Sequence, residues 1–209
     1  MFTLVIGDKN LSSWSLRPWL VLRHFGIEFR EEKLNLDTPG FRPRISQFSG
    51  ALRVPVLIDG DLRIWDSLAI VEYLNEQAQG RGWPSDPASR ALARSISAEM
   101  HSGFPALRQT WSMRAVGTNP NVPLSADAAT DVARIQAIWE DCRGRHGARG
   151  PWLFGSWCIA DAMYAPVVLR FHHYGARLSP LAQSYCDQTL SDPHLQQWIH
   201  DAEQEVGAA

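Results

Sequence analysis

The sequence predicts a small α/β domain followed by an all-helical domain, and three observations support this fold class. Apolar runs typical of strands alternate with helical periodicity over residues 1–78. Residues 79–87 contain two glycines and two prolines, a composition typical of an interdomain linker. Residues 88–209 carry helical patterns and no strand pattern. We therefore expect two domains joined by a short linker.

Composition narrows the classes of function. The chain has 209 residues, of which 45% are hydrophobic, so it can bury an ordinary globular core. Its 20 basic and 22 acidic residues give no general attraction to nucleic acid or to a membrane surface. The three cysteines have neither zinc-ligand spacing nor the even count of a disulfide framework. With no signal peptide and no 18-residue apolar run, we expect a cytoplasmic protein without a bound metal.

The first domain opens with a strand and a helix. Phe2–Ile6 is a short continuous apolar run, which is typical of a buried strand. Apolar residues then recur at helical spacing until Gly26, a typical residue after a helix end. Proline lacks an N–H and is favoured in the first turn, so Pro18 predicts a helix whose N-cap is Trp14 or Ser15.

The rest of the first domain is predicted to contain a strand, a weakly helical segment, a hairpin and a second helix. Residues 27–36 alternate as a strand, and residues 41–48 are weakly helical. Two apolar runs around Asp59-Gly60 predict a hairpin over 53–64, because this dipeptide is typical of a tight turn. A helix with good periodicity follows over 68–74.

The second domain is predicted to contain only helices. Clusters of proline, glycine and asparagine near 117–125, 147–151 and 175–180 separate the helical segments. The predicted helices cover 88–116, 126–146, 158–174 and 180–204.

Ser12 and Ser13 lie just ahead of the first predicted helix. Their hydroxyls can cap the helix or donate to an anion such as a thiolate. A thiol of pKa about 8.5 is mostly ionised at neutral pH after a fall of about 2 units, which requires about 2.7 kcal/mol. A helix terminus contributes about 0.3–1 kcal/mol and a hydrogen bond to a charged group about 1.5–3 kcal/mol. The two contributions together are sufficient.

Two dipeptides also have both a structural and a functional interpretation. Val54-Pro55 is either an ordinary trans start of an edge strand or a cis turn that offers the Val54 backbone to an extended ligand. Asp66-Ser67 is either a helix cap or a site for an α-amino acid head group. In the second case Asp66 would hold the ammonium, and Ser67 with the free N–H groups would hold the carboxylate.

These features occur in an order that resembles the cytosolic glutathione S-transferase family over essentially the whole chain. The segments that carry the resemblance are SSWSLRPW, RVPVLIDG, DSLAIVEYL and GSWCIADAMYAP. The serine-rich start is most similar to the zeta-like and related bacterial branches. The resemblance implies a thioredoxin-like N-terminal domain at 1–78, a linker at 79–87 and an all-helical C-terminal domain at 88–209. It also implies a homodimer that uses glutathione as co-substrate, with a role in detoxification.

The resemblance further implies residue roles. Ser12 or Ser13 would stabilise the glutathione thiolate, and Val54, ahead of a cis Pro55, would pair with the cysteinyl backbone. The two ends of glutathione would be held by Asp66 and Ser67 at the γ-glutamyl group and by Arg53 at the glycyl carboxylate.

A second set lies where relatives build the wall of the electrophile site. Trp111 and Met113 suit a flat apolar substrate, and Arg114 or Arg170 an acidic one, although core packing is the competing interpretation of each. Trp14 is the remaining member of this set. It stands where some branches carry a cysteine, which argues against chemistry that needs an enzyme thiol.

Three other positions bear on the resemblance. Leu52 replaces a glycine that relatives usually carry before the Val-Pro pair, so the resemblance does not predict the backbone path of that loop. Cys158 occupies a helix cap that is usually Ser or Thr, which predicts a loss of about 1 kcal/mol. Arg17, in the first helix, is interpreted as structural.

We thus expect an enzyme that activates glutathione as a thiolate for attack on a small electrophile. One alternative is a glutathione-dependent cis–trans isomerase of the maleylacetoacetate type. Another, motivated by Leu52, is a non-catalytic protein of the same fold that binds a ligand.

Overall fold

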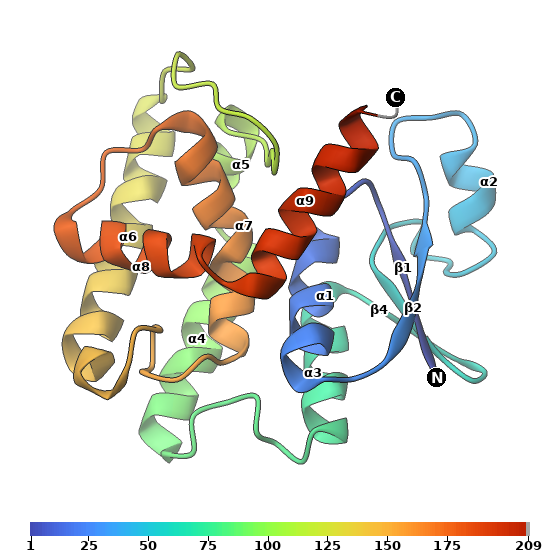
Figure 1. Ribbon diagram of the computed structural model, residues 1–209, viewed down its shortest axis with the longest axis horizontal. Helices are drawn as coiled ribbons and strands as arrows, with labels where there is room; N and C mark the ends of the chain where they lie inside the picture. Colours follow the sequence, from blue (N-terminus) through green and yellow to red (C-terminus); the bar gives the residue numbers. More distant parts are fainter. Residues whose placement is uncertain (208–209) are drawn as a thin grey trace.

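The computed structural model describes residues 1–207. Within them a four-stranded sheet has the order β2-β1-β3-β4, with β1 parallel to β2 and antiparallel to β3. The strands are β1 (Phe2–Ile6), β2 (Phe29–Lys33), β3 (Val56–Asp59) and β4 (Leu62–Trp65). Two helices, α1 (Ser13–Phe25) and α3 (Ser67–Gln77), separate the sheet from the helical part, and α2 (Phe41–Ile45) lies on the other side (Figure 1). This arrangement confirms the predicted thioredoxin-like sheet-and-helix unit.

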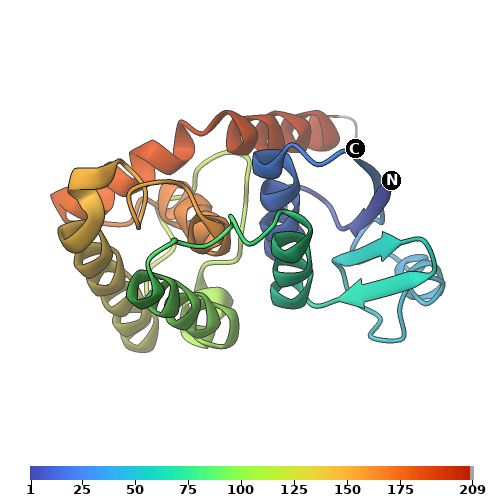
Figure 2. The same cartoon turned by 90° about the horizontal axis from the view of Figure 1, so that it is seen from below.

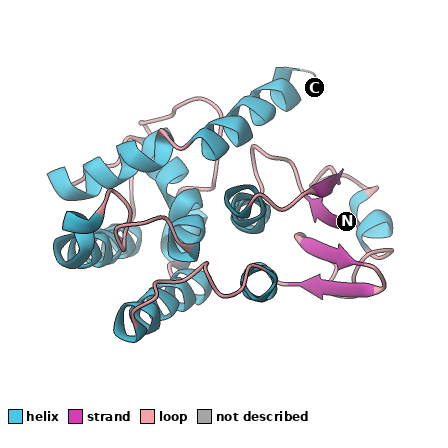
Figure 3. Ribbon diagram, turned by 60° about the horizontal axis from the view of Figure 1, so that its bottom comes forward, coloured by secondary structure: helices cyan, strands magenta, loops and turns pink. Residues whose placement is uncertain are grey.

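The second part of the described chain is helical. Figure 3 shows all strands at one end of the molecule. The helices are α4 (Pro87–Ser102), α5 (Pro105–Thr110), α6 (Ala126–His146), α7 (Ile159–Tyr174), α8 (Pro180–Leu190) and α9 (Pro193–Gly207), with a 3-10 turn at Gly147–Arg149. Nearly every residue of α7 is buried, because this helix packs on α1, α4 and α8. The predicted all-helical second part is confirmed.

The two faces of the sheet pack separately, as side-chain alternation along a strand requires. Leu4 and Ile6 of β1 join the large core that continues through α1 and α3 into the helical part. Val5 points the other way, into a small cluster with Ile45 of α2. One apolar core extends through both parts, so the packing does not mark where one domain ends and the next begins. The predicted domain boundaries at residues 78 and 88 therefore stay predictions.

The first helix begins earlier than expected. α1 starts at Ser13, and Ser12 is its N-cap, accepting the Ser15 N–H at 3.4 Å. The prediction of an N-cap at Trp14 or Ser15 was wrong, and Pro18 lies inside the helix. The serine cap fixed the start, and the helix tolerates one missing N–H a turn later.

Two of the long predicted helices are broken. The segment 88–116 divides where Phe104 adopts a left-handed backbone with φ of 60°. The segment 180–204 divides before Pro193, which opens α9. By contrast, the predicted helix 126–146 coincides with α6, because Ser125 caps it through the Ala128 N–H.

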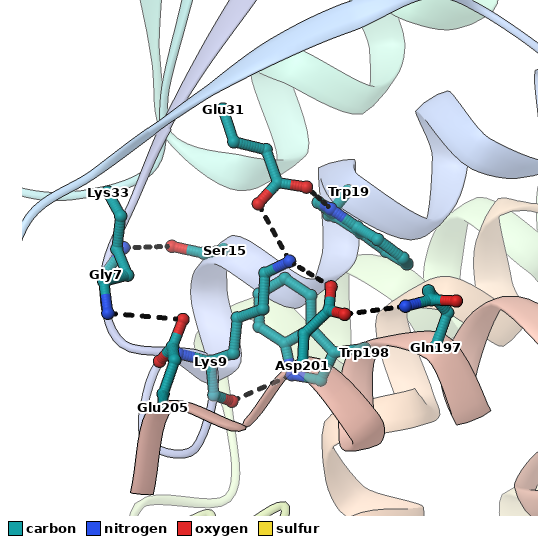
Figure 4. A network of polar contacts seen from close by, with 10 residues as sticks. All are labelled: Gly7, Lys9, Ser15, Trp19, Glu31, Lys33, Gln197, Trp198, Asp201 and Glu205. Atoms are coloured by element: carbon teal, nitrogen blue, oxygen red, sulfur yellow. Dashed lines mark hydrogen bonds and ion pairs between the residues drawn. The ribbon is translucent and has the colours of Figure 1, made fainter. Parts of the chain in front are cut away.

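Helix α9 returns from the helical part to the edge of the sheet (Figure 2). Its docking centres on Lys9, which is 5% exposed and follows β1. The Lys9 ammonium lies 2.8 Å from a Glu31 oxygen and 2.6 Å from an Asp201 oxygen (Figure 4). The Trp198 indole donates to the Lys9 carbonyl at 2.8 Å, and the Lys9 N–H donates to Glu205 at 2.9 Å. The network ties the loop after β1 to the last helix.

Candidate active site

A cavity of about 580 Å³ opens where the two parts of the molecule meet. Its walls come from the start of α1, the loop before β3, the end of β4, the start of α3 and the end of α4. The lining residues are Trp14, Ala51, Arg53, Val54, Pro55, Trp65, Asp66, Ser67 and His101. The predicted contacts of the two ends and the backbone of glutathione thus line one cavity.

The loop before β3 has an unusual backbone. The Val54–Pro55 peptide is cis, as the family resemblance implied. Leu52 has φ of 53°, in the left-handed region where glycine is favoured. Its half-buried side chain packs on the small apolar cluster behind the sheet, which compensates for the backbone conformation. The loop therefore reaches the cavity with a leucine in place of the usual glycine.

Asp66 and Ser67 meet the cavity at the N-terminus of α3. Asp66 has φ of 75°, and its Oδ1 accepts the Leu68 N–H at 2.8 Å. The Ser67 side chain is 1% exposed, yet its hydroxyl has no hydrogen-bond partner among residues 1–207. A buried hydroxyl without a partner is costly. Its position in the wall of the cavity suits a ligand oxygen.

His101 approaches the same carboxylate from the helical part. Its Nε2 lies 3.1 Å from Asp66 Oδ2, and its ring contacts Trp14 edge-on with centroids 5.3 Å apart. Burial lowers the pKa of His101, and the nearby cations Arg17 and Arg108 lower it further against the opposing pull of Asp66. The imidazole is therefore harder to protonate than that of an ordinary histidine. Local sequence gave no signal for this pair, which is brought together because α1 and α4 both pack on α7 and α3 packs on α1.

The two candidate serines differ in their bonding. Ser12 is committed to capping, because its hydroxyl donates to Ser15 Oγ at 2.7 Å and accepts the Ser15 N–H. Ser13 begins α1, and its hydroxyl makes no hydrogen bond within the described chain. Neither side chain lines the cavity, which Trp14 reaches from the same turn.

Most of the predicted electrophile wall does not line this cavity, so for those residues the expectation stays a prediction. Trp111 and Met113 are in the core, where the Trp111 indole donates to the Val122 carbonyl at 3.0 Å. Arg170 is 4% exposed and Arg114 is half-buried, and neither lines the cavity. Of the five predicted residues only Trp14 does. Trp111 and Met113 follow the end of α5, and the Trp111 ring stacks on Tyr174 of α7 with centroids 5.2 Å apart. The local sequence pattern does not contain that tertiary contact.

Two further features are absent from residues 1–207. No group of three or more His, Cys, Asp or Glu side chains is arranged to hold a metal ion. No helix in this range combines the length and apolarity needed to cross a bilayer.

Comparison with known proteins places this geometry in context. Residues 11–77 match the family model described as glutathione S-transferase, N-terminal domain. The chain is 30% identical over 178 residues to rat (Rattus norvegicus) maleylacetoacetate isomerase, covering 82% of this chain and 79% of the relative.

Solved structures share the fold. A glutathione transferase homologue from Burkholderia with bound glutathione superposes with a TM-score of 0.72 at 23% identity, over 97% of this chain and 98% of that one. The nitrogen regulation fragment of a yeast prion protein superposes with a TM-score of 0.73 at 17% identity, over 95% of this chain and 96% of that one.

Proposed function

Since the chain belongs to the cytosolic glutathione S-transferase family, we propose that it binds glutathione and transfers it to a small electrophile. In this proposal residues 1–78 hold glutathione, the electrophile lies between them and residues 88–209, and the segment 79–87 links the two. The homodimer and the cytoplasmic location stay predictions.

One observation carries the proposal: Ser67 presents a buried hydroxyl, without a partner among residues 1–207, beside the Asp66 carboxylate. The pair matches an α-amino acid head group, because Asp66 can accept from an ammonium and Ser67 can donate to a carboxylate. The first N–H groups of α3 add donors, and the helix dipole favours the anion. Both ends of the site fit glutathione, since Arg53 lines the same cavity and suits a second carboxylate.

The backbone and the hydroxyls complete the fit. Val54 lines the cavity and offers its N–H and C=O to the middle of an extended peptide. We assign Ser13 rather than Ser12 to the sulfur, because the Ser12 hydroxyl is already bonded to Ser15. Glutathione would supply a thiolate that forms a carbon–sulfur bond while the leaving group departs with its electron pair. Ser13 and the start of α1 would lower the thiol pKa by stabilising that negative charge.

The test is the conjugation of glutathione to 1-chloro-2,4-dinitrobenzene. Two signals monitor the reaction: the absorbance of the thioether product and the loss of free thiol. A transferase consumes one thiol for each chloride released. Binding of glutathione without turnover of this or other electrophiles would instead identify a binding protein, the role motivated by Leu52.

Isomerisation is a second candidate, favoured by the 30% identity to rat maleylacetoacetate isomerase. There the sulfur would add to a double bond and leave again, so no thiol is consumed. An assay with maleylacetoacetate that requires glutathione and leaves its concentration unchanged would establish this reaction in place of transfer.

A further inference from the structure

Two histidines meet where the end of α1 packs on the start of α9. His24 precedes the last residue of α1, and His194 follows the first residue of α9. Their rings are in edge contact, with centroids 4.7 Å apart and planes at 79°. The His24 ring also stacks on Trp157, with centroids 3.8 Å apart and planes at 14°. The cluster therefore joins the sheet-and-helix part of the chain to the helical part.

The carboxylate of Asp192 connects the two elements. Its Oδ2 lies 3.0 Å from His24 Nε2, and its Oδ1 accepts the backbone N–H groups of His194 and Leu195 at 2.9 and 3.0 Å. Burial acts to raise the pKa of Asp192, but His24 and the two N–H groups outweigh it and hold that pKa below its ordinary value. Asp192 is therefore charged throughout the range in which histidines titrate, and it caps α9 while it holds α1.

The other charged groups on the His194 side are mostly cations. His194 lines a cavity of about 530 Å³ whose other charged residues are Met1, through its N-terminal amine, and Arg23, Glu28, Arg30 and Glu31. Glu31 is already paired with Lys9 at 2.8 Å, which leaves more positive than negative groups in this cavity. A protonated His194 would therefore add a cation to a place that already has an excess of them.

On the other side, His24 lines a small cavity with Asp161 of α7. The oxygens of Asp161 are occupied, because Oδ1 accepts from the Leu153 N–H and the Tyr185 hydroxyl, and Oδ2 accepts from the Cys158 N–H. Among residues 1–207, Asp192 is thus the carboxylate in ion-pair contact with this cluster.

The balance of charge in the cluster depends on pH. Burial lowers the pKa of His194, and the charges of His24 and Arg23 lower it further against the opposing pull of Asp192. A lowered histidine pKa means that the unfolded chain takes up the proton more readily than the folded chain does. The folded state therefore loses stability as the pH falls below about 6.5. Two imidazolium rings in edge contact also repel each other, and this repulsion acts between α1 and α9.

We propose that His24, His194 and Asp192 form an acid-sensitive joint that loosens the start of α9 from the end of α1 when both imidazoles are protonated. At neutral pH the ring contact and the Asp192 contact hold the two helices together. Below about pH 6 the second proton places two cations against one carboxylate, and the ring contact opens. The joint needs no glutathione, so it is separate from the proposed function.

The first test is thermal unfolding of the wild type and His194→Gln at about pH 7.5 and about pH 5.5. The fall in Tm between these pH values should be about 2–4 °C smaller in His194→Gln, because glutamine takes up no proton. The control is His200→Gln, since His200 lies on the same helix but is exposed and 3.9 Å from Glu203. Other groups that titrate in this range, such as Asp161, are present in all three proteins. Equal falls in the wild type and His194→Gln would overturn the proposal.

The second test measures the coupling between the rings. NMR of the imidazole Cε1 protons follows each histidine through its titration. The pKa of His194 should rise in His24→Gln, because a neighbouring cation is removed. A His194 pKa that is unchanged or lower in this variant would overturn the joint.

Hydrogen exchange then shows whether α9 moves. The amide of Leu195 is bonded to Asp192, so its protection reports the start of the helix. Between the two pH values this protection should fall about 5-fold more in the wild type than in His194→Gln, the factor that matches the expected change in Tm. An equal loss of protection in both proteins would contradict the release of α9.

Discussion

Replacing Lys9 by methionine tests whether the buried ion network holds α9 against the sheet. The variant keeps an unbranched stem that is one atom shorter and removes the ammonium that lies 2.8 Å from Glu31 and 2.6 Å from Asp201. Breaking a buried pair costs about 3–5 kcal/mol, and an exposed one about 0–1 kcal/mol. The two carboxylate side chains are 33% and 30% exposed, so the cost lies between these limits, at about 2 kcal/mol.

The assay is thermal and urea unfolding. A loss of about 2 kcal/mol corresponds to a fall in Tm of roughly 4–8 °C for a chain of this size. Lys33→Met is the matched control, because Lys33 is more exposed and its ammonium lies 3.5 Å from a single carboxylate, Glu205. A Lys9→Met variant within 0.5 kcal/mol of the wild type, a threshold of about the size of ordinary surface effects, would refute the reasoning.

The same network predicts a pH dependence. Burial raises the pKa of Asp201, but hydrogen bonds from Lys9 and Gln197 outweigh it, so the pKa lies below its ordinary value. A lowered carboxyl pKa gives stability that is present at neutral pH and lost as the pH falls through that pKa. The difference between the wild type and Lys9→Met should therefore shrink below pH 3.8. An undiminished difference there would contradict the assigned pairing.

The remaining predictions concern the cap of α7 and the cavity. Cys158→Ser should raise the Tm by about 2–4 °C, because a hydroxyl caps a helix better than a thiol by about 1 kcal/mol; an unchanged or lower Tm would contradict this. Ser13→Ala should lower kcat/KM for the aryl chloride about 10-fold or more, whereas Ser12→Ala should mainly lower the Tm; the reverse pattern would reassign the thiolate partner. Glutathione affinity should fall as the pH falls below 6.5, because protonated His101 competes for Asp66; a His101→Gln variant with the same pH profile would exclude this competition.

The sequence predicted those parts of the site that are contiguous in the chain. Arg53–Pro55 and Asp66-Ser67 each place several contacts within a few residues, so a local pattern was enough to identify them. The Asp66–His101 pair joins the start of α3 to the end of α4, far apart in the sequence. Such contacts depend on how the helices cross, and hydrophobic periodicity does not encode that angle.

Errors at the helix ends have a related cause. Pro18 favoured a late start for α1, but the Ser12 cap placed the start ahead of it. Trp111 and Met113 were expected on a helix beside the electrophile, yet both follow the end of α5 and are buried in the core. The predicted helix 88–116 ran through both residues, whereas tertiary packing beyond the end of α5 sets their side-chain environment.

Calorimetric titration of glutathione into Ser67→Ala tests the central claim most directly. Ser97→Ala is the matched control, because Ser97, on α4, is also fully buried with a hydroxyl that has no partner in the described chain, but it does not line the cavity. Since neither change removes an internal hydrogen bond, both variants should keep the wild-type Tm. We predict that Ser67→Ala binds glutathione about 10- to 100-fold more weakly and that Ser97→Ala binds as the wild type does. Equal affinity in all three proteins would contradict the assignment of this cavity to glutathione.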